Sequence, residues 1–278
     1  MTTTDQYAVF GHPINHSKSP RIHQLFAEQT QQKITYVAQD VPAEHFKQAI
    51  KSFFKQGGKG LNCTVPLKEL AWQQTDILSQ RAQFSKAVNT LALQEDGSIL
   101  GDNTDGLGLV ADLTSNHSIS LLNSRILILG AGGASRGIIS PLMEKSPKQL
   151  VIVNRTVDKA ITLSHEFSEL GDIKGCSYND IKNEQFDLIL NATSASLSGE
   201  LPPLPDNILA QKGCCYDLAY GNKPTTFVNW GVAHDAKKSL DGLGMLVEQA
   251  AEAFYIWRRI RPETKKIITL LNSERKFI

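Results

Sequence analysis

An apolar run that leads directly into three glycines is the feature that most limits what this chain can fold into. Residues 125–137 read RILILGAGGASRG, so the glycines are Gly130, Gly132 and Gly133. In a βαβ unit the first glycine permits the tight turn, and the second lets a pyrophosphate approach the backbone at the helix N-terminus. The third fingerprint position holds Ser135 in place of glycine. The pattern predicts a dinucleotide site at Gly130, Ala131, Gly132, Gly133 and Ala134, and the alternative is an ordinary turn between a strand and a helix.

The next strand, LVIVNRT, indicates which dinucleotide is bound. Sites for NAD commonly place an acidic residue at the end of this strand, where it holds the ribose 2′-hydroxyl. This chain has Asn154 there, followed by Arg155 and Thr156, with Lys159 one turn later. A guanidinium binds a phosphate bidentately, so the segment favours NADP over NAD. Asp158 dilutes the positive charge, and the alternative is that the two cations are only solvated surface groups.

Strand-like and helical segments alternate along the chain in two series that divide near residue 105. This alternation predicts α/β layers with parallel sheets, in two domains with a cleft between them. An Asp-Gly turn after AVNTLAL predicts a hairpin within the first series. Two helices, about 244–260 and 262–273, close the chain, and we expect them to fold back on the first domain. The expected strands are 7–11, 35–41 and 60–65 in the first domain, and 125–130, 149–154, 186–193 and 213–220 in the second.

Composition excludes several classes of partner. The 278 residues carry a formal net charge of +1 without a block of like charge, which argues against nucleic-acid and anionic-membrane surfaces. No apolar run approaches the roughly 20 residues that span a bilayer, and the N-terminus does not read as a secretory signal. Cys63, Cys176, Cys214 and Cys215 lack metal-ligand spacing. We therefore expect neither metal nor disulfide, and a cytoplasmic protein.

Lys68 stands at an electrostatically unfavourable place. It follows the strand-like segment LNCTVP, at the start of a predicted helix, where the helix dipole disfavours positive charge. Asn62 and Thr64 precede it, two residues apart, so their side chains share one face of the strand. Lys68 is either a solvated surface residue or a cation that exchanges a proton with something bound nearby.

Other polar residues lie at strand ends and within apolar segments. Three of them also have a structural explanation: Ser19 before Pro20 suits a helix cap, Asp105 could cap the helix that follows it, and a buried Gln249 could bind neighbouring backbone. Ser17 has no such explanation. As a set they offer hydrogen-bond donors and acceptors with little charge, which suits a small polyhydroxylated molecule. The set comprises Ser17, Asn62, Thr64, Asn89 and Gln249.

The motifs together resemble shikimate dehydrogenases. They are NHSKSP, NCTVPLK, AVNTL, GDNTDG, GAGGASRG, NRT, NATS, YDLAY and DGLGMLVEQAAEAF, in order along nearly the whole chain. The resemblance implies NADP-linked interconversion of 3-dehydroshikimate and shikimate, in the biosynthesis of aromatic amino acids. It implies an N-terminal α/β/α substrate-binding catalytic domain, 1–105 plus 243–278, and a Rossmann-type doubly wound NADP-binding domain, 106–242.

The resemblance also implies roles for individual residues. Lys68 and Asp105 would be the catalytic pair, with Lys68 as general acid in reduction and Asp105 orienting it. Substrate would contact Ser17, Ser19, Asn62, Thr64, Lys68, Asn89, Asp105, Tyr220 and Gln249. NADP would contact Gly130, Ala131, Gly132, Gly133, Ala134, Asn154, Arg155, Thr156, Lys159, Thr193 and Gly242.

Two rival functions stay open at this point. A related enzyme could use quinate as well as shikimate, often with NAD, although the basic NRT segment speaks against NAD. A non-catalytic NADP-binding regulatory protein would keep the glycines, but it would not need Lys68 and Asp105. The chain could act as a monomer or as a homodimer.

Overall fold

The computed structural model describes residues 4–275, and these form two compact units. The first unit contains the described residues up to Gly108 together with Val247–Thr269. The second unit contains Leu109–Leu246 and the described residues from Leu270 onward. Three helices therefore contain a boundary between the units: α5 (Asp105–Ala111), α9 (Leu243–Arg258) and α10 (Lys265–Ser273).

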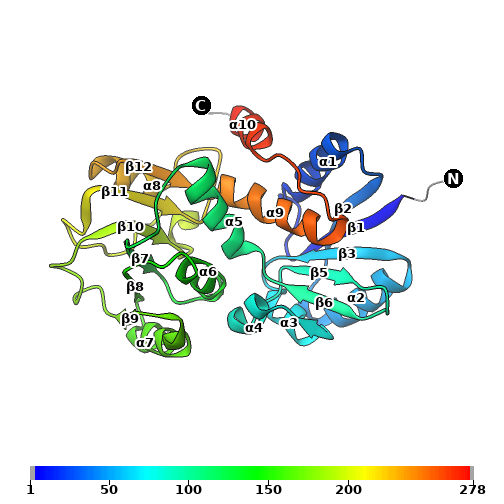
Figure 1. Ribbon diagram of the computed structural model, residues 1–278, viewed down its shortest axis with the longest axis horizontal. Helices are drawn as coiled ribbons and strands as arrows, with labels where there is room; N and C mark the ends of the chain where they lie inside the picture. Colours follow the sequence, from blue (N-terminus) through cyan, green and yellow to red (C-terminus); the bar gives the residue numbers. More distant parts are fainter. Residues whose placement is uncertain (1–3, 276–278) are drawn as a thin grey trace. The chain divides into compact units, whose positions relative to one another are not determined.

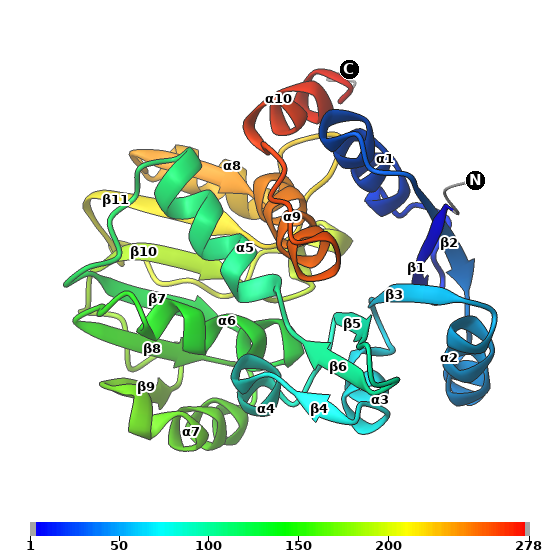
Figure 2. The same ribbon diagram turned by 45° about the vertical axis from the view of Figure 1, so that its right-hand side comes forward.

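The first unit is built on a mixed sheet in the order β2-β1-β3-β5-β6-β4 (Figure 1; β4 is labelled in Figure 2). Strand β1 pairs in parallel with β2 and β3, whereas β5 runs antiparallel to both β3 and β6. The predicted hairpin is confirmed, because the Asp-Gly turn returns β6 beside β5, and it adds antiparallel strands to the predicted parallel ones. Gly97 in that turn has φ +87°, a conformation that favours glycine. The strands are β1 (Asp5–Gly11), β2 (Ile34–Asp40), β3 (Gly58–Cys63), β4 (Ile77–Leu78), β5 (Thr90–Leu93) and β6 (Ile99–Asp102).

Helices of the first unit pack through apolar positions at helical spacing. Helix α2 (Phe46–Lys55) buries Phe46, Ile50 and Phe53 in a core that includes Phe10 of β1 and Leu61 of β3. This burial holds α2 against the sheet. The ends of the strands are bordered by the connecting segments. The other helices are α1 (Ser19–Thr30), α3 (Lys68–Gln73) and α4 (Gln80–Ser85), with a 3₁₀ turn at Ala43–His45.

The second unit is a parallel sheet in the order β12-β11-β10-β7-β8-β9 (Figure 1). Read from β9, the strands come third, second, first, fourth, fifth and sixth along the chain, which is the doubly wound order of dinucleotide-binding folds. The sequence did not predict the outer strands β9 and β12, which are four residues each and carry no continuous apolar run. The strands are β7 (Arg125–Leu129), β8 (Gln149–Val153), β9 (Ile173–Cys176), β10 (Phe186–Asn191), β11 (Leu209–Asp217) and β12 (Lys238–Asp241).

Helices of the second unit connect the parallel strands. Helix α7 packs on β8 and β9, and α8 packs on β11 and β12. Because crossovers between parallel strands are right-handed as a rule, the strand order implies that α6 and α7 lie on one face of the sheet and α8 on the other. The central strands β7, β8 and β10 are buried along most of their length, as expected of strands covered on both faces. The helices are α6 (Gly133–Met143), α7 (Val157–Glu166) and α8 (Thr226–Ala233), with a π-helical turn at Asp112–Asn116 and 3₁₀ turns at Ser168–Leu170 and Ala195–Ser198.

A buried histidine lies within the aromatic core of the first unit. The His23 ring of α1 stacks on Tyr36 of β2 at 4.1 Å between centroids and contacts Phe26 and Phe254. Burial lowers the pKa of His23 to about 3, because the charged imidazolium would lose its hydration. The side chain is therefore neutral in the folded protein at physiological pH.

This burial predicts acid sensitivity. An unfolded histidine titrates near 6.5, so between about pH 6.5 and 3 the unfolded chain binds one proton more than the folded chain. The free energy of unfolding should then fall as pH is lowered through this window, by about 1.4 kcal/mol per pH unit from this group. Denaturant titrations across the window should show a shallower fall for His23→Phe. The exposed His45 provides a matched control, His45→Gln, which should keep the wild-type dependence; equal slopes for all three proteins would contradict the account.

Candidate active site

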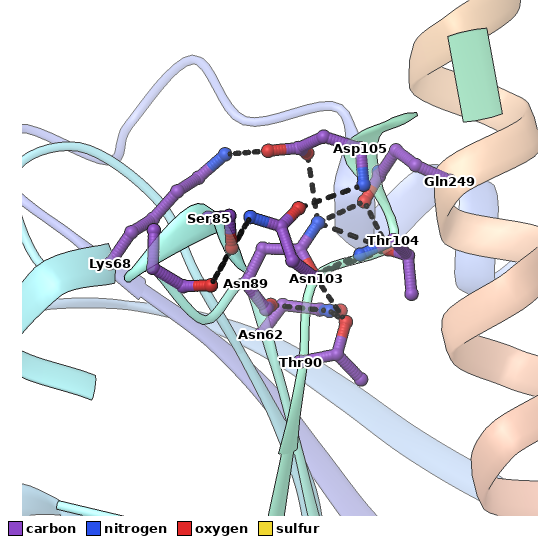
Figure 3. Close-up of polar contacts among 10 residues, drawn as sticks. Asn62, Lys68, Ser85, Asn89, Thr90, Asn103, Thr104, Asp105 and Gln249 are labelled. Carbon is purple, nitrogen blue, oxygen red and sulfur yellow. Dashed lines mark hydrogen bonds and ion pairs between the residues drawn. The ribbon is translucent and has the colours of Figure 1, made fainter. Parts of the chain in front are cut away.

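Lys68 is the first residue of α3 and faces a carboxylate (Figure 3). Its Nζ lies 2.6 Å from Asp105 Oδ2, and the two side chains are only 28% and 15% exposed. Residues 64–67 form the turn that joins β3 to α3, closed by a hydrogen bond from the Leu67 N–H to the Thr64 carbonyl. The unfavourable position of Lys68 at the helix start is thus offset by a specific partner from a distant segment.

Asp105 binds side chains with both carboxylate oxygens. Oδ2 accepts from Lys68, and Oδ1 accepts from Asn89 Nδ2 at 2.8 Å. Asp105 is itself the first residue of α5, and its N–H donates to Asn103 Oδ1 at 3.1 Å. The side chain that satisfies a backbone N–H at this helix start is therefore that of Asn103, so helix capping does not account for Asp105.

Asn89 and Gln249 meet through side-chain atoms. Asn89 is buried just before β5, and its Nδ2 lies 3.0 Å from Thr104 Oγ1 and 3.3 Å from Gln249 Oε1. Thr104 Oγ1 is also 3.4 Å from Gln249 Oε1, while the Thr104 N–H donates to Asn89 Oδ1. Gln249 of α9 therefore directs its carbonyl oxygen to side chains of the strand ends, as Figure 3 shows.

Asn62 continues the same network at the end of β3. The side chain donates both amide hydrogens within the protein, to the Asn89 carbonyl at 3.0 Å and to Thr90 Oγ1 at 3.1 Å. Its Oδ1 accepts from the Tyr36 hydroxyl at 2.7 Å. Burial raises the pKa of the Tyr36 phenol, whereas the nearby Ser19 side chain lowers it. Any further ligand of Asn62 must therefore meet the carbonyl oxygen, because an amide oxygen can accept twice.

The two serines and Thr64 flank this network. Helix α1 begins at Ser19 with Lys18 as its cap residue, so the prediction of Ser19 as the cap was wrong by one residue. Ser17 Oγ accepts from the Ser19 N–H at 3.3 Å, which ties the loop to the helix start. Thr64 lies beside Gly11, where an added Cβ would approach Thr64 Cγ2 to 2.4 Å. Only glycine at position 11 lets β1 end this close to the Thr64 side chain.

One hydrogen-bonded network thus joins five of the residues predicted for catalysis and substrate binding. It runs from Lys68 through Asp105 and Asn89 to Gln249, and through Thr90 to Asn62 and Tyr36. Four members were not predicted, although Asn103 and Thr104 stand in GDNTDG and Thr90 follows Asn89. The signal that could have identified these members is the presence of buried polar residues at the ends of consecutive strands. The missed members are Tyr36, Thr90, Asn103 and Thr104.

In the second unit, the glycine turn after β7 is open toward solvent. Gly130 has φ +102°, and its N–H donates to the Val153 carbonyl at 2.7 Å. A Cβ added at Gly132 or Gly133 would meet no atom within 4 Å, which leaves room for a ligand against the backbone at the start of α6. Ser135 is buried and donates to the Gly130 carbonyl at 2.7 Å. The serine therefore closes the turn at the position where the fingerprint has its third glycine.

The segment after β8 presents the predicted phosphate-binding cations. Arg155 and Lys159 are exposed, and Asn154 Nδ2 donates to the Thr156 carbonyl at 2.9 Å, which shapes the turn into α7. Beside it lies a hollow of about 240 Å³ whose lining includes Ala131 and Lys159. Ala131 of the glycine turn and Lys159 of α7 thus line one concave surface, large enough for part of a nucleotide.

Three further predicted residues belong to the second unit. A Cβ added at Gly130 would lie 3.1 Å from Thr193 Cγ2, so Thr193 borders the glycine turn. Gly242 donates its N–H to the Ala219 carbonyl at 3.1 Å, and a Cβ there would approach the Leu218 carbonyl to 2.2 Å. Tyr220 is half-buried, and burial raises the pKa of its phenol. Thr193, Tyr220 and Gly242 therefore follow β10, β11 and β12, at one edge of the parallel sheet.

Two further sequence expectations concern membranes and cysteines. Within residues 4–275, every helix is too short or too polar to cross a bilayer. All four cysteines are buried in strands with free thiols, and burial raises their pKa values.

Three family models match consecutive parts of the chain. Residues 9–91 match a model described as the shikimate dehydrogenase substrate binding domain. Residues 112–198 match one described as shikimate / quinate 5-dehydrogenase, and residues 242–271 match the shikimate 5′-dehydrogenase C-terminal domain.

Curated proteins and solved structures match over nearly the full length. A shikimate dehydrogenase (NADP(+)) of Methylococcus capsulatus is 58% identical over 276 residues, covering 99% of each chain. The crystal structure of an Ael1 enzyme from Pseudomonas putida aligns with a TM-score of 0.92 at 43% identity, over 96% of this chain and 98% of that one. Shikimate 5-dehydrogenase of Thermus thermophilus, solved with NADP(H) and shikimate, aligns with a TM-score of 0.85 at 32% identity, over 95% and 97%.

Proposed function

The chain belongs to the shikimate dehydrogenase family, and from that premise we propose that Lys68 and Asp105 are the acid–base pair of its reaction. The activity is that of an NADP-dependent oxidoreductase of this family. The reaction proposed is the reversible reduction of 3-dehydroshikimate to shikimate. The observation that carries the proposal is the 2.6 Å contact between Lys68 Nζ and Asp105, set within a network of neutral hydrogen-bonding groups.

Reduction of a ketone needs a hydride at carbon and a proton at oxygen. NADPH, when bound, supplies the hydride. Lys68 Nζ donates a proton to the carbonyl oxygen as the carbon–oxygen π bond breaks, and the product is the secondary alcohol. In the oxidation direction the neutral amine takes the hydroxyl proton back. Asp105 holds Nζ in place and stabilises its charged form, and Asn89 fixes the carboxylate from the other side.

The surrounding groups recognise hydroxyls and a carboxylate without a second cation. Asn62 accepts from a substrate hydroxyl through Oδ1, because both of its amide hydrogens are already donated within the protein. Asn89 and Gln249 contact hydroxyls near the reacting carbon. The hydroxyl groups of Ser17, Ser19 and Thr64 are suited to the substrate carboxylate, since each is a small donor at the border of the network.

The second unit holds the cofactor. The open backbone at Gly132 and Gly133 fits a pyrophosphate, and Arg155 with Lys159 fits the adenosine 2′-phosphate. Asn154 and Thr156 shape the turn that presents Arg155. The other contacts proposed for NADP are Gly130, Ala131, Ala134, Thr193 and Gly242, with Tyr220 near the nicotinamide and substrate.

These assignments give the domains their roles. We propose that residues 1–105 and 243–278 bind substrate and that residues 106–242 bind NADP. The enzyme would act in the cytoplasm, in the biosynthesis of aromatic amino acids, as a monomer or a homodimer. Quinate is the alternative substrate, because one matching family model is described as shikimate / quinate 5-dehydrogenase. A purely regulatory NADP-binding protein is disfavoured, since it would have no use for the paired Lys68 and Asp105.

Removing the proposed proton donor tests the mechanism. Lys68→Ala should lower kcat/KM for shikimate oxidation by about 10²–10⁴, because positioned proton transfer contributes about that much. Absorbance of the reduced nicotinamide at saturating NADP measures the rate. Lys59→Ala removes an exposed lysine from β3 of the same unit and should stay within about twofold of wild type. A loss below tenfold for Lys68→Ala would remove Lys68 from the chemistry.

Removing the proposed phosphate ligand tests cofactor preference. Arg155→Gln should raise KM for NADP about tenfold and leave KM for NAD nearly unchanged, because only NADP carries the 2′-phosphate. Lys182→Gln removes one exposed positive charge elsewhere on the second unit and controls for net charge. Equal effects of Arg155→Gln on the two cofactors would contradict the assignment.

A further inference from the structure

Asp217 is a buried carboxylate that no step of the proposed reaction uses. It is the last residue of β11, and its side chain is 0% exposed. Oδ2 accepts from Ser196 Oγ and from Thr225 Oγ1, both at 2.6 Å. Oδ1 accepts from Asn191 Nδ2 at 3.2 Å and from the Ala219 N–H at 3.1 Å. Four donors therefore converge on one carboxylate.

The donors come from separate segments at the carboxyl edge of the parallel sheet. Asn191 ends β10 and Ser196 lies in the turn that follows it; Ala219 follows β11, and Thr225 caps α8. Burial raises the pKa of Asp217, whereas hydrogen bonds from Ser196 and Thr225 lower it. Burying a carboxylate costs several kcal/mol unless its lone pairs are satisfied, and here the donors that satisfy it tie the segments together.

Each tied segment leads to a residue proposed to contact the cofactor. Asn191 Oδ1 accepts from the Thr193 N–H at 3.2 Å and from Thr193 Oγ1 at 2.7 Å, so the Asn191 side chain links Thr193 to Asp217. Ala219 is followed directly by Tyr220, and its carbonyl accepts from the Gly242 N–H at 3.1 Å. In open parallel sheets, ligands bind at this carboxyl edge, where the connecting loops meet.

We infer that Asp217 is a positioning residue for NADP, which holds Thr193, Tyr220 and Gly242 in one arrangement at the carboxyl ends of β10, β11 and β12. The inference rests on the proposed function for its assignment of those three residues to the cofactor site. Asp217 does not touch the cofactor in this account. It acts through Asn191, Ser196, Ala219 and Thr225, and it lowers the cost of ordering their loops when NADP binds.

Asp217→Asn tests the inference with little change of shape. The amide nitrogen cannot accept a hydrogen bond, so donors that now converge on the carboxylate lose an acceptor. Calorimetric titration of the whole chain with NADP, in the absence of shikimate, should show Kd raised about tenfold or more. KM for NADP should rise in parallel. Wild-type NADP affinity in a folded Asp217→Asn protein would overturn the inference.

A matched control separates positioning from stability. Asp187 lies at the opposite end of β10, where Oδ2 accepts from the Arg125 N–H at 2.8 Å. Asp187→Asn also removes a carboxylate that accepts a hydrogen bond at a strand end, here an exposed one, and should lower the thermal unfolding midpoint, yet it should leave Kd for NADP within about twofold. Equal losses of NADP affinity in the two variants would show a general stability effect and would overturn the inference.

A milder variant keeps the test decisive if Asp217→Asn does not fold. Ser196→Ala removes one donor from a half-buried turn and should raise Kd for NADP about threefold or more; unchanged affinity would then count against the inference. Titration of the wild-type chain with NADP distinguishes failure of the proposed function from failure of the role of Asp217. Failure of the wild-type chain to bind NADP would refute the proposed function, whereas normal wild-type binding with unaltered variants would refute only the role of Asp217.

Discussion

The carboxylate of Asp105 is the constraint on which the first unit's site depends. It receives Lys68 on one oxygen and Asn89 on the other, and its own position is set by Asn103 at the start of α5. Without Asp105, the ammonium of Lys68 would lose its ion pair. It would then lie at the N-terminus of α3, where the helix dipole disfavours a positive charge. Asn89 would also lose a charged acceptor beside Gln249. The placement of Lys68 and of the amides thus follows from one side chain.

The two units meet different chemical demands with different groups. The first unit offers amide and hydroxyl groups whose orientations are fixed by the hydrogen bonds among them. Such groups suit the recognition of a small polyhydroxylated molecule. The second unit offers open backbone at Gly132 and Gly133 and the exposed Arg155, which suit phosphates. Asp217 supports the second surface much as Asp105 supports the first, since each buried or half-buried carboxylate gathers donors from separate segments.

The sequence predicted the structural features that are determined by their own residues. The glycine turn, the hairpin and the central strands could be read directly, because each is fixed by its own residues. The edge strands β9 and β12 could not, because they are short and form only by pairing with β8 and β11. Tyr36 was missed for a related reason: it stands in a largely exposed strand, and only the tertiary fold brings its hydroxyl to Asn62. The start of α1 differed by one residue, since the local Ser-Pro pair fits either register.

The central claim is that Lys68 and Asp105 act as one unit, and a double-mutant cycle tests it most directly. kcat/KM for shikimate with NADP would be measured for wild type, Lys68→Ala, Asp105→Asn and the double variant. If the carboxylate acts by holding the lysine, the double variant should be within about threefold of the slower single variant. Losses that multiply in the double variant would show that the two residues act independently and would contradict the account.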